Sequence, residues 1–126
     1  MKILEAAENY LEIILIELEK HGRVRSIDIC NALNYAKPTI SVMMKQLREN
    51  GYVEMDHDGY ITLTDIGSGI AKKIYERHQV LASFLMGIGV DEETAYKGAG
   101  KIEHDLSETS FEMLKKHYQK GTQALS

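Results

Sequence analysis

The spacing of apolar residues predicts a chain built mainly of helices. Over residues 3–20, apolar side chains recur every three or four positions, which is the repeat of an amphipathic helix. Ile13 and Ile16 fall on a second side of this helix, so we expect it to pack against two neighbours. Further helical patterns follow at residues 27–33, 38–50, 65–85, 92–106 and 108–118.

Several of these helices are preceded by residues that favour a helix N-terminus. Ser26, Asp91 and Ser107 stand where a side-chain oxygen can accept a hydrogen bond from the first free N–H groups. Pro38 opens the helix at residues 38–50, where its missing N–H costs nothing. We therefore expect Ser26, Asp91 and Ser107 to cap the helices that follow them.

Two short stretches, residues 52–55 and 60–63, alternate in polarity as half-buried strands do. Asp58-Gly59 lies between them and is a strong signal for a hairpin turn. A helix, a short helix, a tight turn, another helix and a hairpin, in this order, are typical of a winged helix-turn-helix. The predicted fold class is mainly α, with a winged helix-turn-helix domain over residues 1–72 and a helical domain over residues 73–126.

The composition excludes several classes of protein. Apolar residues make up 44% and charged residues 27% of the chain, an ordinary globular balance. No apolar run reaches the ~18 residues of a membrane span, and the N-terminus carries no signal-peptide pattern. The single cysteine, Cys30, rules out an internal disulfide framework and a cysteine-rich zinc site. We therefore expect a cytoplasmic protein without a membrane partner.

The distribution of charge along the chain is more informative about binding partners than the net charge of −4. Between Lys20 and Arg48 lie six basic residues and one acid, a net +5. A local basic patch of this kind is what contact with DNA phosphates requires. The alternative, a solvated face with charge scattered by chance, is weakened because the patch coincides with the predicted helix-turn-helix.

The exposed face of the helix at residues 38–50 lies opposite its apolar stripe of Ile40, Met43, Met44 and Leu47. Hydroxyl groups on that face suit base edges or phosphates, and apolar groups suit thymine methyls. Basic side chains and the start of the preceding helix suit phosphates. Use of the domain for protein contacts is the alternative, which the basic segment opposes. The predicted DNA-binding residues are Arg25, Ser26, Lys37, Pro38, Thr39, Ser41, Val42 and Lys45.

A second group of residues suggests metal chemistry. His78 shares an apolar helix stripe, Glu103 and His104 are adjacent near the end of the helix at residues 92–106, and Glu12 lies one turn after Asn9 on the first helix. Two Glu and two His suit Mn²⁺, Fe²⁺, Co²⁺ or Zn²⁺. Spacing alone does not distinguish such a site from surface charges and a solvated histidine. We do not expect an enzyme, because no paired nucleophile or oxyanion donor accompanies the cluster.

Runs of residues along nearly the whole chain resemble the diphtheria-toxin-repressor and manganese-transport-regulator family. The run from Ile102 to Ser107, at its distance from Arg77-His78, is the most specific of them. The other matching runs are Glu8 to Glu12, Val24 to Ile29, Lys37 to Ser41, Glu76 to His78 and Gly89 to Glu93. The length of the chain resembles the short type, which lacks the SH3-like third domain.

This resemblance implies a homodimeric, metal-activated transcription repressor of genes for metal-ion uptake or homeostasis. The first helix and the C-terminal helices are expected to build the dimerisation and metal-binding region. Double-stranded operator DNA is the expected partner. Mn²⁺ or Fe²⁺ is the expected cofactor, and Zn²⁺ or Co²⁺ can replace it in vitro.

The resemblance places the family's metal ligands on Asn9, Glu12, His78, Glu103 and His104, with a sixth position at residue 100. That position is usually Glu or Cys and bridges two ions in the manganese type, but here it is glycine. We therefore expect one ion per chain, held by a Glu and His set that ties the first helix to the C-terminal helices. The alternative is a winged-helix regulator that has lost metal control.

Overall fold

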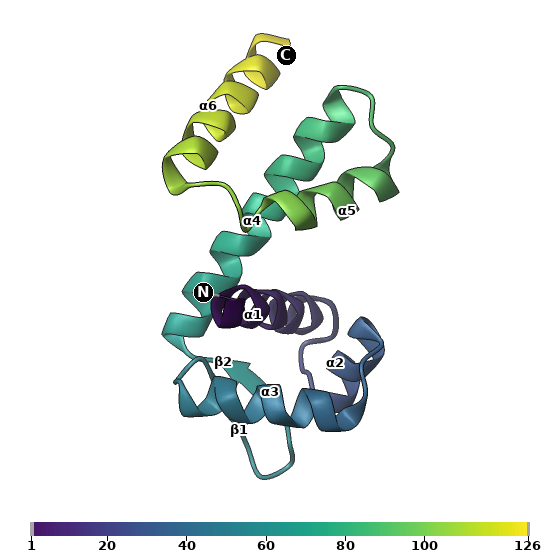
Figure 1. Cartoon of the computed structure of the whole chain (residues 1–126), viewed down its shortest axis with the longest axis vertical. Coiled ribbons are helices and arrows are strands. Elements are labelled where there is room, and N and C mark those ends of the chain that lie inside the picture. Colours follow the sequence, from purple (N-terminus) through teal and green to yellow (C-terminus); the bar gives the residue numbers. More distant parts are fainter. Residues whose placement is uncertain (1, 126) are drawn as a thin grey trace. The chain divides into compact units, whose positions relative to one another are not determined.

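The computed structural model describes residues 2–125, with side chains described from residue 5 to residue 119. Over this range the chain forms six helices and one two-stranded sheet, which confirms the mainly helical fold (Figure 1). None of these helices has the length and apolar character needed to cross a membrane. The elements are α1 (Lys2–His21), α2 (Ser26–Leu33), α3 (Lys37–Glu49), β1 (Val53–Met55), β2 (Ile61–Leu63), α4 (Asp65–Gly87), α5 (Glu92–Ile102) and α6 (Glu108–Leu125).

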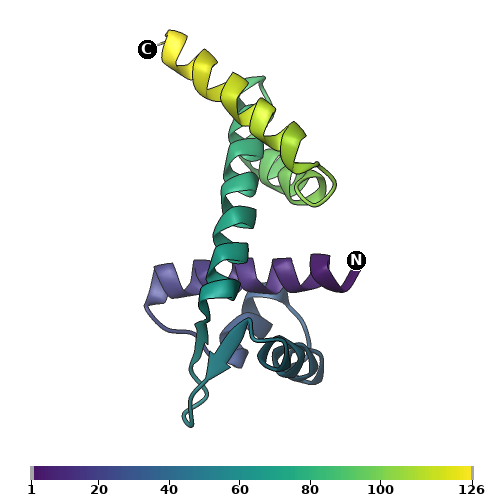
Figure 2. The same ribbon diagram turned by 90° about the vertical axis from the view of Figure 1, so that its left-hand side faces the viewer.

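The chain divides into two compact units, an N-terminal unit that ends at Ile74 and a C-terminal unit that begins at Tyr75. The N-terminal unit contains α1 to α3, the β1–β2 hairpin and the start of α4, and Figure 2 shows the hairpin loop projecting from it. Its core collects apolar side chains from each of these elements, because the predicted stripes turn inward. Those that are almost completely buried are Leu11, Ile14, Val24, Ile29, Ile40, Met44, Leu47, Val53, Ile61 and Ala71.

The hairpin forms as predicted from Asp58-Gly59. The strands pair antiparallel, with Val53 opposite Leu63. In the turn, one carboxylate oxygen of Asp56 accepts hydrogen bonds at 2.9 Å from the backbone N–H groups of residues 58 and 60. Gly59 adopts φ +86°, a left-handed conformation that favours glycine. The turn therefore depends on both an acceptor side chain and a glycine.

The start of α2 differs from the prediction that Ser26 caps this helix. The helix includes Ser26, and Arg25 occupies the N-cap position in an extended conformation. Arg25 forms an antiparallel bridge with Tyr60 beside the hairpin, and its backbone N–H donates to Asp28 Oδ2 at 2.8 Å. The prediction is wrong because residue 25 provides the cap: its carbonyl accepts a hydrogen bond from the N–H of Asp28 at 3.0 Å, and its bridge with Tyr60 keeps it extended, so the helix begins immediately after it.

The start of α4 is fixed against the end of α3 and the hairpin. The Thr64 hydroxyl accepts a hydrogen bond from the backbone N–H of Gly67 at 3.1 Å and donates to the carbonyl of Gly51 at 2.6 Å. A Cβ at residue 67 would lie 2.0 Å from the carbonyl oxygen of Tyr52. Only glycine therefore allows the helix to approach this backbone.

In the C-terminal unit, the second part of α4 packs with α5 and α6 around small and branched side chains. Leu81, Ala82 and Ala99 form a buried cluster, and Met86, Leu106 and Leu114 pack against it. The predicted caps are confirmed for α5 and α6. Asp91 accepts a hydrogen bond from the N–H of residue 94 at 3.1 Å, and the Ser107 hydroxyl accepts one from the N–H of residue 110 at 3.0 Å.

The predicted C-terminal end of α5 is wrong. The helix ends at Ile102 and not at residue 106, so Glu103 and His104 lie in the turn that follows it. The side chain of Arg77 on α4 donates hydrogen bonds to the backbone carbonyls of Glu103 at 3.0 Å and Leu106 at 2.9 Å. These carbonyls bond to a side chain and not to a further helical turn, so the chain turns toward α6.

Candidate nucleic-acid interface and metal centre

α3 presents the predicted DNA-facing side chains to solvent. Its apolar stripe is buried at Ile40, Met44 and Leu47. Val42, on the opposite face, is 57% exposed although it is apolar. Exposed hydroxyl and apolar groups on one helix face suit contact with base edges and thymine methyls in the major groove. The predicted residues of this face that are exposed are Lys37, Pro38, Thr39, Ser41, Val42 and Lys45.

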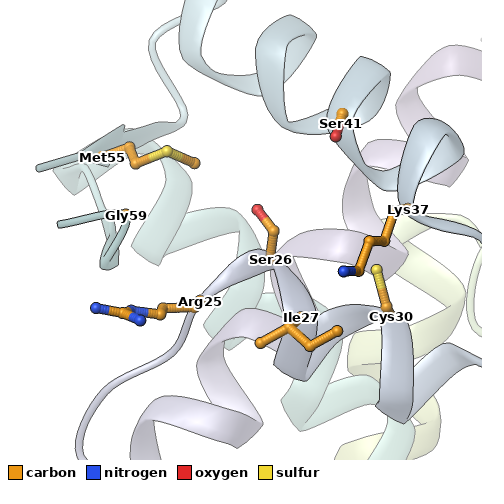
Figure 3. A pocket seen from close by; sticks show the side chains of 8 residues that line it. All are labelled: Arg25, Ser26, Ile27, Cys30, Lys37, Ser41, Met55 and Gly59. Atoms are coloured by element: carbon orange, nitrogen blue, oxygen red, sulfur yellow. The ribbon is translucent and has the colours of Figure 1, made fainter. Parts of the chain in front are cut away.

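Several of the predicted DNA-binding residues line one pocket of about 320 Å³ (Figure 3). Arg25 and Ser26 come from the start of α2, Lys37 and Ser41 from α3, and Gly59 from the hairpin turn. In Figure 3 the Ser26 hydroxyl points into the space between α3 and the hairpin, and Arg25 extends toward the hairpin side. Cationic and hydroxyl groups from the start of α2 and from α3 thus line one hollow beside the hairpin.

Asn9 and Glu12 lie one turn apart on α1 and line a separate pocket of about 340 Å³ in the N-terminal unit. Glu12 is buried and Asn9 is exposed. Thr39, predicted to contact DNA, also lines this pocket, as does Tyr10, whose pKa is raised by burial. A buried carboxylate requires compensation by a cation or by hydrogen bonds, so Glu12 remains a candidate ligand.

The C-terminal unit brings His78, Glu103 and His104 together, although two of them lie in a turn and not on the predicted helix. His78 Nδ1 is 3.4 Å from one carboxylate oxygen of Glu103, and His104 Nε2 is 3.3 Å from the other. The side chain of Glu103 is 1% exposed and that of His104 is 5% exposed. Imidazole nitrogen and carboxylate oxygen are ligand types that suit a borderline divalent ion, and His78 and Glu103 place such atoms 3.4 Å apart.

The hydrogen bonding of His78 orients its Nδ1 toward Glu103. Its Nε2 lies 3.0 Å from the backbone carbonyl oxygen of Tyr96, which can only accept, so Nε2 is the protonated nitrogen. In the neutral ring, Nδ1 then presents a lone pair toward the Glu103 carboxylate. Metal-binding histidines typically donate their other N–H to a carbonyl or carboxylate in this way, which orients the ligand nitrogen.

Arg77 holds the turn of the candidate metal site, a contact that the sequence pattern did not reveal. Its buried side chain makes the two hydrogen bonds that hold the turn carrying Glu103 and His104, and its guanidinium lies 5.0 Å from the ring centre of Phe111. The one signal in the sequence is a charged residue three positions after Ile74 on a buried helix stripe. That signal indicates that the charge of Arg77 is compensated by a partner, but it does not identify the partner.

Gly100 lies on α5 beside His78. A Cβ at this position would be 3.8 Å from His78 Cε1, an ordinary van der Waals distance, so a Cβ fits there. Glycine itself supplies no side-chain ligand at this position.

The fold and these surfaces define a winged helix-turn-helix DNA-binding protein with a helical metal-binding unit. A family model described as "Iron dependent repressor, N-terminal DNA binding domain" matches residues 2–61. A second, described as "Iron dependent repressor, metal binding and dimerisation domain", matches residues 64–123. The chain therefore belongs to the iron-dependent repressor family, and the resemblance drawn from its sequence is confirmed.

Individual relatives agree with this assignment. The chain is 32% identical over 116 residues to the transcriptional regulator MntR of Escherichia coli O6:H1, covering 92% of this chain and 75% of the relative. It is 35% identical over 107 residues to the HTH-type transcriptional regulator MntR of Bacillus subtilis, covering 85% and 75%. The solved structure of the manganese regulator SloR is similar with a TM-score of 0.79 at 26% identity. That match covers 90% of this chain and 53% of SloR, so the chain spans about half of the SloR chain.

Proposed function

We propose that this chain is a metal-responsive transcription repressor, in which a bound divalent ion increases the affinity of a homodimer for operator DNA. The genes it controls serve the uptake or homeostasis of metal ions. The observation that carries the proposal is the nearly buried Glu103 between two histidines, in a chain that also has a winged helix-turn-helix with an exposed reading face. A tenfold gain in operator affinity requires a coupling of ~1.4 kcal/mol between metal and DNA.

The proposed DNA contacts divide by chemistry. Ser41 and Val42 on α3 read base edges in the major groove, together with Pro38 and Thr39. The basic side chains and the Ser26 hydroxyl contact phosphates, which position the helix without reading sequence. Exposure of the α3 residues and the shared pocket at the start of α2 support this division. The phosphate-contacting residues are Arg25, Ser26, Lys37 and Lys45.

The proposed metal ligands are His78, Glu103 and His104, with Glu12 and Asn9 added on the basis of the sequence resemblance. When bound, the ion supplies a positive charge that neutralises the carboxylates. We propose one ion per chain, because residue 100 supplies no side chain to bridge two ions. Mn²⁺ or Fe²⁺ is the proposed physiological ion. Zn²⁺ and Co²⁺ suit the same donors in vitro, so the supply of each ion in the cell selects among them.

Two further aspects follow from the proposed role. A repressor that acts on operator DNA works in the cytoplasm of a bacterial or archaeal cell, where that DNA lies. It needs no catalytic residues, and His78 and His104 serve as ligands and not as general bases. The alternative of a regulator without metal control is not favoured, because the match to the family's metal-binding and dimerisation domain supports metal control and Glu103 lies against both histidines.

Selection from random duplexes tests this function without assuming an operator sequence. Purified protein is incubated with a random-sequence DNA pool, with and without MnCl₂, and the retained duplexes are sequenced. We expect enrichment of a two-fold symmetric site only with metal, since two heads of a dimer read two half-sites. Recovery of no enriched sequence under either condition would contradict the proposal.

A further inference from the structure

Arg25 and Tyr60 are fixed relative to one another at the base of the hairpin. Their backbones form an antiparallel bridge, and the neighbouring Ile61 N–H donates to the carbonyl of Val24 at 2.8 Å. The N–H of Arg25 is also held by Asp28 at 2.8 Å. The backbone of Arg25 is thus fixed on both sides, and its side chain starts from a defined position.

Two guanidinium groups gather on the ring of Tyr60. That of Arg25 lies 4.3 Å from the ring centre and that of Arg23 lies 5.2 Å from it. Both distances are within the ~6 Å range of cation–π attraction. Both arginines are exposed and Tyr60 is half-buried. An aromatic ring therefore restricts two long side chains that would otherwise sample many rotamers in solvent.

The surroundings of this trio favour an anion. Arg23, Arg25 and Tyr60 line a pocket of about 240 Å³, to which Asp28 also contributes. One carboxylate oxygen of Asp28 already accepts the N–H of Arg25. Two like charges held near one ring repel each other, and a phosphate placed between them relieves that repulsion. Arginine also offers a planar set of donors that suits phosphate oxygens.

We infer that Tyr60 is a positioning residue that holds Arg23 and Arg25 ready for one phosphate of the DNA backbone at the base of the hairpin. The inference rests on the proposed DNA-binding function, adds Arg23 to its phosphate contacts and gives Tyr60 the role of positioning both arginines. Arg25 also lines the pocket that contains Lys37 and Ser41. The phosphate site is therefore continuous with the pocket at the start of the reading helix.

The test compares Tyr60→Leu, which removes the ring, with Tyr60→Phe, which keeps it. Affinity for a labelled random-sequence duplex of about 30 base pairs is measured by fluorescence anisotropy with MnCl₂, over a series of KCl concentrations. We expect Y60L to bind about three- to tenfold more weakly and Y60F to bind as wild type. Thermal unfolding of each variant is followed in parallel.

A double-mutant comparison separates positioning from a structural role. In the background of Arg23→Gln and Arg25→Gln, adding Y60L should weaken binding no further, because Tyr60 acts through these side chains. The double glutamine variant itself should have a shallower salt dependence, by about 0.9 in log–log slope for each phosphate that is no longer bound. Both arginines are exposed, so we expect the double glutamine variant to fold, and it still tests the inference if Y60L does not fold.

Three results would overturn the inference. Equal binding by Y60L and wild type would do so while leaving the proposed function intact. An unchanged salt slope in the double glutamine variant would show that no phosphate is held there. If inorganic phosphate competes for this pocket at constant ionic strength, but the double glutamine variant has the same salt slope for DNA as the wild type, the pocket would be assigned to a free anion and not to a DNA phosphate. Wild-type protein that binds no duplex would contradict the proposed function as well.

Discussion

Gly100 offers a sharp test of how the metal-binding unit is built. It lies within α5, near the C-terminal end of that helix, and its φ is not in the left-handed region. Glycine in a helix costs about 0.5–1 kcal/mol relative to alanine because it loses more backbone freedom on folding. The Cβ of an alanine would meet His78 Cε1 at 3.8 Å, which requires no displacement. Gly100→Ala should therefore stabilise the protein by about 0.5–1 kcal/mol, a rise in melting temperature of a few degrees.

Substitutions at residue 100 also test whether each chain binds one ion or two. Gly100→Ala adds no ligand, so the number of Mn²⁺ ions per chain should stay at the wild-type value, which we expect to be one. Gly100→Glu adds a carboxylate beside His78, and it should raise either the number of bound ions or the affinity for the first. Calorimetric unfolding and equilibrium dialysis with Mn²⁺ provide the two readouts.

Specific outcomes would refute this reasoning. Destabilisation by Gly100→Ala would show that a side chain does not fit beside His78. Two tightly bound ions in the wild-type protein would show that the second site does not depend on residue 100. In either case, glycine at this position would not explain the number of ions.

Three other substitutions, one of them with a matched control, test the packing and the candidate metal site of the two units. Arg77→Met leaves two backbone carbonyls without their donor and should destabilise the protein by about 2–4 kcal/mol in urea unfolding, while weakening Mn²⁺ binding; unchanged stability would contradict its role in the turn. Glu103→Gln preserves shape but removes the ligand charge, and calorimetric titration should show at least about a tenfold loss of Mn²⁺ affinity with the fold intact. Gly67→Ala places a Cβ 2.0 Å from the Tyr52 carbonyl oxygen and should lower the free energy of unfolding by about 3 kcal/mol. The control Gly69→Ala has open space around its Cβ and should not destabilise the protein. Similar stabilities for the two variants would argue against the close approach at residue 67.

The hairpin and most of the helices could be predicted because their signals are local. Asp58-Gly59 specifies the turn, Asp91 and Ser107 cap the helices that follow them, and Pro38 begins α3 within its first turn. Each signal acts through residues three or four positions away. Local reasoning therefore suffices for these elements.

The features that could not be predicted depend on residues distant in sequence. The turn after α5 depends on Arg77, 26 residues before Glu103, which donates to the carbonyls of Glu103 and Leu106. Arg25 stays extended at the N-cap of α2, where it pairs with Tyr60. Periodicity describes how a helix continues, but it does not reveal contacts that residues beyond the helix end make with another element.

The candidate metal site shows the same division. His78 could be singled out from its place on an apolar stripe, and Glu103 and His104 from their residue types. The helix that was expected to orient Glu103 and His104 ends before them, so their positions depend on the turn that Arg77 holds. The residue types were predictable, and the backbone that orients them was not.

The measurement that tests the central claim most directly is the affinity for an enriched duplex with and without Mn²⁺ at fixed salt, for wild-type protein and for His104→Ala. Mn²⁺ should increase wild-type affinity at least about tenfold, equivalent to ~1.4 kcal/mol of coupling. His104→Ala should keep the weak metal-free affinity and lose the increase. Equal wild-type affinity with and without each of Mn²⁺, Fe²⁺, Co²⁺ and Zn²⁺, or a full response by His104→Ala, would contradict the account.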